Sequence, residues 1–468
     1  MVFSSTIFLF IFLPICLLVY AIIPARLRNL WLLTASIAFY AWGEPKWILL
    51  LGFSTLVNYG AGLLLDVVKK PAGRKLVLAL DCVFNLAVLF WFKYLGFSVS
   101  LIDRAFGTTL QADHDWIRQI VMPIGISFFT FQIMSYVIDT YRRQVSAQKN
   151  PLKLGLYIML FPQMIAGPIV RYIDVANEID SRTFTLDGVY RGIRRFMVGF
   201  IKKVIISNRM AEVADIAFGQ ADLTGATAWL GIICYALQIF FDFSAYSDMA
   251  IGMGEMFGFH FLENFNYPYI ATSIQDFWRR WHISLSSWFR DYLYIPLGGN
   301  RRGKFKTYRN LLIVFFTTGL WHGASLNFIV WGMFHGLFQL LERFKPVKKV
   351  LNAVPKWLRW MYTMLVVLVG WVFFRADNLS AAMSYLGSMF APSSFDLNAA
   401  LFLLRPERIC ILLLGIFLST PVYRRISKAC ETGGFKALAL DAAVVLGFVV
   451  AMLYLTGSSF NPFIYFRF

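Results

Sequence analysis

Long apolar stretches recur along the whole chain. Residues 6–24, 47–65, 76–92, 408–420 and 437–456 are almost entirely apolar. Most of them approach the length of about 20 residues that an α-helix needs to cross a bilayer. This pattern predicts an all-α polytopic membrane protein.

Other apolar segments are shorter or are broken by proline and glycine. The breaks stand out at Pro123–Gly125 and at Phe161–Pro168. Broken backbone at membrane depth is tolerated only where other protein or a water-filled cavity satisfies its polar groups. We therefore expect about eleven to thirteen membrane segments, some of them re-entrant.

The composition supports this class. Of 468 residues, 58% are hydrophobic and only 15% are charged, whereas a soluble globular chain has about one quarter charged residues. The sequence contains no internal repeat, and no Pro-, Gly- and Ser-rich linker divides it. We expect a single integral-membrane domain spanning residues 1–468.

The net charge of +18 would suggest nucleic acid for a soluble protein. In a membrane protein, basic loops instead stay on the cytoplasmic side, so we expect no nucleic-acid partner. Arg26 and Arg28 follow residues 6–24, and the basic segment Lys69–Lys75 follows residues 47–65. The segment Asp103–Asp115 is instead mainly acidic. This bias predicts an external N-terminus, with residues 1–24 retained as a first helix, because no positive charge precedes them as in a signal peptide.

Cysteine and histidine spacing gives no sign of a metal centre. The five cysteines are widely separated and contain no C-x-x-C pair, so we expect small buried side chains rather than disulfides. No H-E-x-x-H or similar ligand pair occurs among the five histidines, which are His114, His260, His282, His322 and His335. We expect chemistry without a metal or a permanently bound cofactor.

The polar stretch Asp276–Tyr294 interleaves five charged side chains with aromatic residues. At about 2.5–3.5 kcal/mol for each charge at the bilayer centre, exposing them to lipid would cost on the order of 12–17 kcal/mol. The segment must lie at the interface or fold inward with its charges paired. Asp276 and Arg280 are four residues apart, so on a helix they would pair with each other.

Two histidines are candidates for chemistry. His322 lies in the apolar run Leu311–Trp331, where burial would keep it neutral and able to accept a proton. His282 follows the polar strip of Asp276, and the residues alone allow it either a structural or a direct role. Asp242 and Asp248 are expected to be packing or hydrogen-bonding groups rather than catalysts.

Taken together, the motifs resemble the membrane-bound O-acyltransferases, and among them the bacterial polysaccharide O-acetylation branch typified by the membrane subunit for alginate O-acetylation. The resemblance runs from Met1–Ser5 to Asn461–Phe468. Besides the two histidine segments, it rests on Pro123–Phe131, Gly167–Pro168, Phe241–Met249, Glu263–Asn266, Leu297–Arg301 and Gly370–Ala376.

The resemblance implies a ring of tilted helices around a central polar tunnel, with acetyl-CoA as acyl donor entering from the cytoplasm. The family's principal histidine falls on His322 and its second histidine on His282, which would act as a base, bind donor or polarise the acyl group. His322 would take a proton from an attacking hydroxyl and return it to the leaving thiolate. The basic run Arg301, Arg302, Lys304 and Lys306 could hold coenzyme A phosphates or serve as a plain cytoplasmic loop.

The function implied is O-acetylation of an exopolysaccharide of the alginate or cellulose type, at a bacterial inner membrane and with a periplasmic N-terminus. The acetyl group would pass to a periplasmic acetyltransferase partner within the polysaccharide machinery. Two alternatives remain open. One is a D-alanyl, lipid or protein acyltransferase of the same superfamily, and the other is a transporter of polysaccharide or lipid-linked precursor that performs no covalent chemistry.

Overall fold

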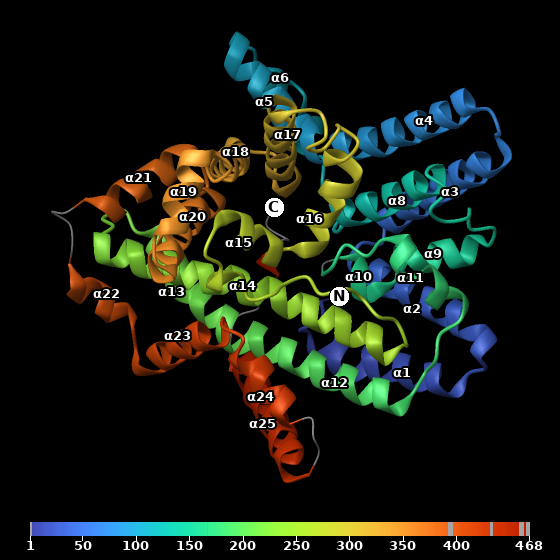
Figure 1. Ribbon diagram of the computed structural model, residues 1–468. Helices are drawn as coiled ribbons and strands as arrows, with labels where there is room; N and C mark the ends of the chain where they lie inside the picture. Colours follow the sequence, from blue (N-terminus) through green and yellow to red (C-terminus); the bar gives the residue numbers. More distant parts are fainter. Residues whose placement is uncertain (1, 166, 392–395, 431–433, 458–462, 465–468) are drawn as a thin grey trace. The chain divides into compact units, whose positions relative to one another are not determined.

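The computed structural model describes residues 2–165, 167–391, 396–430, 434–457 and 463–464 (Figure 1). These residues form helices, turns and loops and contain no strand, which confirms the all-α class. Backbone contacts divide the chain into two compact units, residues 1–193 with 249–262 and residues 194–248 with 263–468. The single domain expected for the whole chain stays a prediction. Met1 and most of the closing motif lie outside the described residues.

The first unit is built from the N-terminal helices. Its helices are α1 (Leu13–Ile22), α2 (Arg28–Gly43), α3 (Trp47–Val67), α4 (Pro71–Leu89), α5 (Leu95–Phe106), α6 (Leu110–Asp113), α7 (Asp115–Arg118), α8 (Ile126–Tyr141), α9 (Pro151–Met159), α10 (Phe161–Met164) and α11 (Tyr172–Asp180). Two long helices, α12 (Leu186–Ile201) and α14 (Gly225–Met256), contribute residues to both units.

The second unit carries the polar stretch and both candidate histidines. Its remaining helices are α13 (Asn208–Gly219), α15 (Ile274–Arg280), α16 (Ile283–Phe289), α17 (Lys304–His322), α18 (Leu326–Leu341), α19 (Lys345–Ala353), α20 (Lys356–Arg375), α21 (Leu379–Phe390), α22 (Leu397–Leu403), α23 (Pro406–Leu418), α24 (Val422–Cys430) and α25 (Phe435–Gly457). A π-helical turn, Lys202–Ser207, joins α12 to α13.

Five described helical segments are long and apolar enough to cross a membrane. They are Trp47–Val67, Pro71–Phe106, Gly225–Met256, Lys356–Arg375 and Phe435–Thr456. The pair α23 and α24, bent by 73°, brings the number to six if it forms one span. This is fewer than the eleven to thirteen segments expected, because that number also counted short and re-entrant stretches. The first apolar stretch, for example, contains only a shorter apolar helix, Phe8–Ile22.

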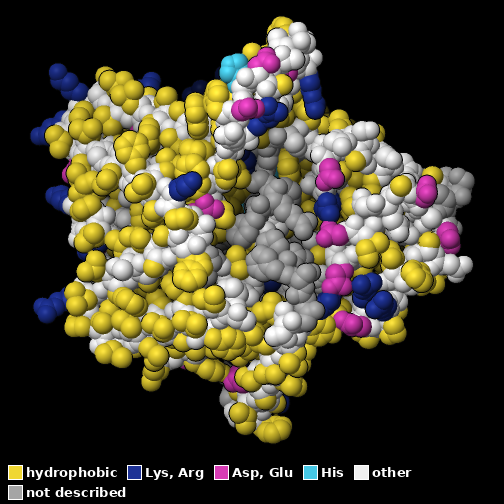
Figure 2. Space-filling model, turned by 180° about the vertical axis from the view of Figure 1, so that it is seen from behind, with side chains coloured by type: hydrophobic (Ala, Val, Ile, Leu, Met, Phe, Trp, Pro, Cys, Tyr) yellow, Lys and Arg dark blue, Asp and Glu magenta, His cyan; other side chains and the backbone are white. Residues whose placement is uncertain are grey.

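The surface is that of a multi-pass membrane protein. Hydrophobic side chains are widespread on the face in Figure 2, most densely over its left part, and Lys, Arg, Asp and Glu side chains are scattered singly or in small groups. The spans differ in how far they are enclosed by protein. Of the apolar 18-residue stretch in each helix, 83% is buried in α14 but only 11% in α25. The helix α14 is therefore a core element, whereas α25 presents most of its side chains outward.

The two proline and glycine breaks predicted in the first unit pack against each other. Gly125 has a positive φ of 79°, and a Cβ added there would lie 2.9 Å from the carbonyl oxygen of Met164. Side chains satisfy the broken backbone: Tyr40 Oη donates to the carbonyl of Ile124 (3.1 Å), and Ser36 Oγ accepts from the N–H of Phe161 (3.1 Å). Protein groups thus meet the requirement for irregular backbone among apolar helices.

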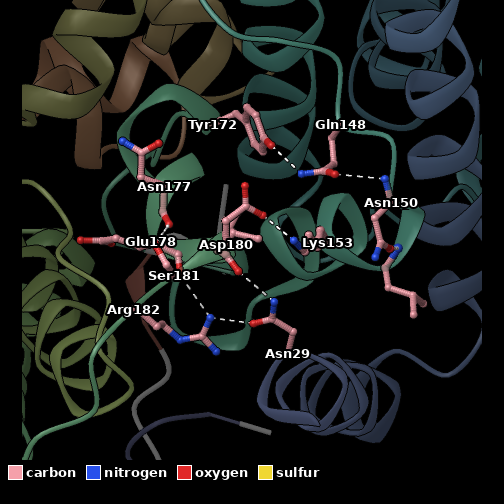
Figure 3. Close-up of polar contacts among 12 residues, drawn as sticks. Asn29, Gln148, Asn150, Lys153, Tyr172, Asn177, Glu178, Asp180, Ser181 and Arg182 are labelled. Atoms are coloured by element: carbon pink, nitrogen blue, oxygen red, sulfur yellow. Dashed lines mark hydrogen bonds and ion pairs between the residues drawn. The ribbon is translucent and has the colours of Figure 1, made fainter. Parts of the chain in front are cut away.

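A polar cluster fixes α11 to its neighbours in this unit (Figure 3). Arg182 donates to Asn29 Oδ1 (2.6 Å) and to the Glu178 carbonyl (3.2 Å), and Lys153 pairs with Asp180 (2.5 Å). Arg182 also donates to the hydroxyl of Tyr20 (2.8 Å). One guanidinium therefore ties the end of α11 to α1 and α2 with a geometry that a lysine could not reproduce.

Arg74 differs from the other basic residues of the Lys69–Lys75 segment. It is only 9% exposed and donates to the carbonyls of Leu65, Thr140 (3.2 Å) and Tyr141 (2.8 Å). These carbonyls belong to the last turns of α3 and α8, where a cation is favourable. Arg74 is thus a structural cap of two helices, not a free loop charge.

Candidate active site

The helices α17 and α18 pack tightly against each other as a hairpin (Figure 1). His322 is the last residue of α17, just before the turn. A Cβ added at Gly319 would lie 2.3 Å from the Phe328 carbonyl oxygen, and one added at Gly332 would lie 2.3 Å from that of Phe315. The two backbones approach so closely that only glycine fits, as at small-residue contacts between membrane helices. This close contact fixes the position of the last turn of α17.

His322 is the last residue of α17 and is 2% exposed. Three aromatic rings surround its imidazole: the ring centres of Trp321, Trp331 and Phe374 lie 5.0, 4.9 and 5.2 Å away, all in edge-on geometry. Trp331 is itself fully buried. The imidazole is therefore buried among aromatic rings.

His282 lies in the short connection between α15 and α16 and is fully buried. Its backbone is left-handed, with φ of 44°, a conformation that is uncommon for non-glycine residues and often found at functional sites. Two backbone hydrogen bonds hold the connection, from the Ile283 N–H to the Asn264 carbonyl and from the Asn266 N–H to the Arg280 carbonyl, each 2.9 Å.

The hydrogen bonds of His282 indicate which of its two ring nitrogens carries the proton. Nδ1 lies 3.1 Å from Asn264 Oδ1, which also accepts from the N–H (3.2 Å) and the hydroxyl (2.9 Å) of Ser284. The amide nitrogen of Asn264 donates to Ser247 Oγ (3.1 Å). An amide oxygen only accepts, so Nδ1 carries the proton and Nε2 keeps its lone pair.

Burial lowers the pKa of His282 to about 3, so this imidazole is neutral near pH 7. Its Nε2 is buried and has no hydrogen-bond partner among the described residues. A nitrogen with a free lone pair accepts a proton or a hydrogen bond. A nitrogen with a pKa this low is a weak base near pH 7, so this tautomer suits a hydrogen-bond acceptor, as in donor binding, and does not suit polarisation of a carbonyl oxygen.

The two histidines belong to one aromatic cluster. The ring centre of Trp321 lies 6.0 Å from that of His282 and 5.0 Å from that of His322. Within the described residues, the indole N–H of Trp331 has no acceptor. The site thus brings together two buried imidazoles and an unpaired donor in an apolar setting.

Asp276 and Arg280, before His282, form the ion pair that their spacing predicts. Arg280 Nε donates to Asp276 Oδ1 (3.0 Å) on α15, and Ser273 caps this helix by accepting from the N–H of Asp276 (3.0 Å). Glu342, at the end of α18, accepts from the backbone N–H groups of Ile274 (2.7 Å) and Gln275 (3.0 Å). A carboxylate at a helix N-terminus is favourable, and here it joins α18 to α15.

Asp242 and Asp248 form ion pairs, in line with the structural role expected for them. Asp242 pairs with Lys203 (2.6 Å) and Asp248 with Lys202 (2.6 Å) and Arg195 (3.0 Å). All five side chains come from α12, the π-helical turn after it, and α14. The pairs join these elements in the second unit.

The basic run lies at the other end of α17 from His322. Arg301, Arg302, Lys304 and Lys306 are all exposed. The turn before α17 is held by Asn310, which donates to the carbonyls of Leu297 (3.3 Å) and Gly299 (3.0 Å). Lys304 and His322 are the first and last residues of α17, so at 1.5 Å per residue their Cα atoms are about 27 Å apart.

Three polar residues of the site were not singled out from the sequence as site residues: Asn264, Ser284 and Ser247. Asn264 lies in the motif Glu263–Asn266, which contributed to the resemblance without a role of its own. Ser284 follows His282 by two residues. The available signal was therefore the presence of these residues in the shared motifs.

An all-helical membrane scaffold that buries two histidines in an aromatic cluster is suited to acyl transfer. A sequence model of the membrane-bound O-acyltransferase family matches residues 146–379, which include both histidines. The chain belongs to this family and is an acyltransferase.

Several relatives align with this chain over nearly its whole length. The chain is 43% identical to the probable alginate O-acetylase of Azotobacter vinelandii and 42% identical to that of Pseudomonas putida, in both cases over 100% of each chain. It is 33% identical to the peptidoglycan O-acetyltransferase of Helicobacter pylori, over 100% of this chain and 98% of the relative.

Proposed function

We propose that the protein moves acetyl groups from cytoplasmic acetyl-CoA across the inner membrane for O-acetylation of an exopolysaccharide of the alginate or cellulose type. The observation that carries the proposal is the pair of buried histidines around Trp321. The relatives named as alginate and peptidoglycan O-acetylating enzymes support a polysaccharide as the final acceptor.

In the proposed reaction, His322 removes the proton from an acceptor hydroxyl while the oxygen attacks the thioester carbonyl carbon. The new C–O bond forms, the C–S bond breaks, and the imidazolium returns its proton to the thiolate as free coenzyme A leaves. A neutral imidazole is suited to both transfers. His282, with its free Nε2 lone pair, accepts a hydrogen bond from donor or acceptor.

The basic run Arg301, Arg302, Lys304 and Lys306 is proposed to hold the coenzyme A phosphates at the mouth of a central tunnel. Its position at the far end of α17 requires the donor to lie extended along this helix, with the thioester near His322. The immediate acceptor is proposed to be a periplasmic acetyltransferase, which would modify the polymer.

Two alternative functions differ from this proposal in the acyl donor or in the need for a base. A D-alanyl or lipid acyltransferase would use another donor in the same site, and a transporter would need no imidazole base. Mass spectrometry of the purified protein with isotopically labelled acetyl-CoA and candidate acceptors separates them. Labelled acetyl ester on an acceptor, with release of free coenzyme A, is the expected result. Absence of transfer with acetyl-CoA alongside transfer of another acyl group would favour the first alternative.

Enlarging the site beside His322 is expected to change donor choice. Trp321→Ala or Trp331→Ala removes a ring that lies about 5 Å from the His322 ring, so the ratio of butyryl-CoA to acetyl-CoA use should rise. Chain-length discrimination in an apolar pocket is worth about 1–3 kcal/mol per methylene, or roughly 10- to 200-fold. Rates with both donors, measured on each purified variant, provide the ratio.

Trp357→Ala is the matched control, because Trp357 is 61% exposed and the substitution should leave the ratio unchanged. Trp331→Phe retains an aromatic ring and should give an intermediate ratio. A lower yield of folded protein with an unchanged donor ratio would show that both tryptophans only pack between helices.

The proposed orientation predicts a labelling pattern. In a background without the native cysteines, Leu110→Cys should react with a membrane-impermeant thiol reagent in cells with a permeable outer membrane, and Ala72→Cys should not. Both positions are exposed, so side-chain burial does not protect either one. The reverse pattern would place the N-terminus in the cytoplasm and move the donor to the other side.

A further inference from the structure

The segment Phe463–Ile464 is anchored on α14 in the second unit. The N–H of Ile464 donates to Asp242 Oδ2 (2.8 Å). The ring of Phe463 is fully buried, with its centre 4.0 Å from that of Tyr246 and 5.7 Å from that of Phe243. Both a hydrogen bond and aromatic contacts therefore hold this segment in place.

The anchor is an ion pair buried in protein. Asp242 Oδ1 lies 2.6 Å from Lys203 Nζ, and each side chain is 2% exposed. Burying two charges costs desolvation energy that their attraction repays only with good geometry and further hydrogen bonds. Lys203 fixes the carboxylate, and the Ile464 N–H satisfies its second oxygen. The pair thus supplies a rigid acceptor for this segment.

The same turns of α14 also contact His282. Phe243, next to Asp242, meets the His282 ring edge-on with centres 4.6 Å apart. Ser247, next to Tyr246, accepts from Asn264, which in turn accepts from His282 Nδ1. The ring of Phe243 therefore lies in contact with both Phe463 and His282.

We propose that Phe463 is a positioning residue for His282 and acts through Phe243. With Phe463 in place, the Phe243 ring has one packed orientation, and the imidazole edge of His282 rests against it. This inference assigns a role to the Phe241–Met249 motif: Asp242 holds the Phe463–Ile464 segment, and Phe243 passes its position on to the imidazole. It rests on the proposed function, since the reaction is acetyl transfer.

A double-mutant cycle on the full-length protein tests the proposal. Phe463→Ala should lower kcat for labelled acetyl transfer by about tenfold, since small misplacements in an active site are costly, with little change in KM for acetyl-CoA. Phe463→Leu should retain most of the rate. The matched control is Phe435→Ala, because Phe435 is 84% exposed and should give wild-type kinetics. Thermal unfolding of each variant reports on folding.

The decisive measurement combines Phe463→Ala with His282→Ala. If Phe463 acts through His282, the double variant should be about as slow as His282→Ala alone, because coupled residues are not additive. Losses that multiply, or wild-type kinetics for Phe463→Ala, would overturn the proposal. Wild-type turnover in His282→Ala would also overturn it and leave the proposed function standing. Absence of acetyl transfer by the wild-type protein would instead contradict the proposed function.

Discussion

His322→Ala is expected to abolish acetyl transfer while leaving expression and membrane insertion unchanged. Removal of a general base typically lowers the rate by about 100- to 10,000-fold. The fold should survive, because His322 ends α17 and the close contacts of the hairpin lie at Gly319 and Gly332. The measurement is transfer of labelled acetyl groups from acetyl-CoA by purified protein, normalised to the amount of folded protein.

Two further variants separate chemistry from packing. His322→Gln keeps a polar side chain of similar size without the basic nitrogen, so it should be as inactive as the alanine variant. His335→Gln is the matched control, because His335 is also fully buried and also contacts Trp331 (ring centres 5.3 Å apart); it should lose far less activity. A rate above about one tenth of wild type in His322→Gln would show that His322 is not the base.

Local features of the chain could be predicted well from the sequence. The apolar stretches are helices, and the Asp276–Arg280 pair forms on α15. The break Pro123–Gly125 directly precedes α8, and the break Phe161–Pro168 contains only the short helix α10. Each of these depends on residues close together in the chain. Spacing of three or four residues and the backbone limits of proline and glycine determine them directly.

Contacts between residues far apart in the chain could not be predicted from the sequence. Asn264 and His282 are 18 residues apart and meet only because the chain turns back between them. Arg74 reads as one of several loop charges, yet it caps helices that end at Val67 and Tyr141. No periodicity encodes such contacts, because the partner is chosen by tertiary packing.

In the candidate site, too, the two histidines could be predicted from the sequence, but their contacts could not. Motif resemblance pointed to His322 and His282 but could not show that Nε2 of His282 keeps its lone pair, since that follows from Asn264 and Ser247. Nor could it show that the basic run begins α17 while His322 ends it. The tautomer of His282 and the separation of the subsites both depend on the three-dimensional fold.

Asn264 is expected to be the residue whose loss most affects His282. In Asn264→Ala, Nδ1 loses its acceptor, the N–H and hydroxyl of Ser284 lose theirs, and the imidazole is free to adopt the other tautomer. We expect a loss of about 10- to 100-fold, by analogy with residues that orient histidine ligands in metal sites. Asn264→Asp keeps the acceptor oxygen, so it should retain more activity than the alanine variant near pH 8.

The aspartate variant also predicts a change in pH dependence. Burial holds the pKa of His282 at about 3, so the wild-type imidazole stays neutral across the working range and contributes no acid limb there. A carboxylate beside Nδ1 favours the imidazolium and raises this pKa. Because the active form is neutral, activity of Asn264→Asp should fall as pH drops through the raised pKa, while wild type changes less. Initial rates from pH 5.5 to 8.5 measure this. The control is Asn398→Asp, the same substitution at an exposed asparagine on α22. Identical pH profiles for Asn264→Asp and wild type, or full activity of Asn264→Ala, would exclude a role for His282 as a neutral base or acceptor.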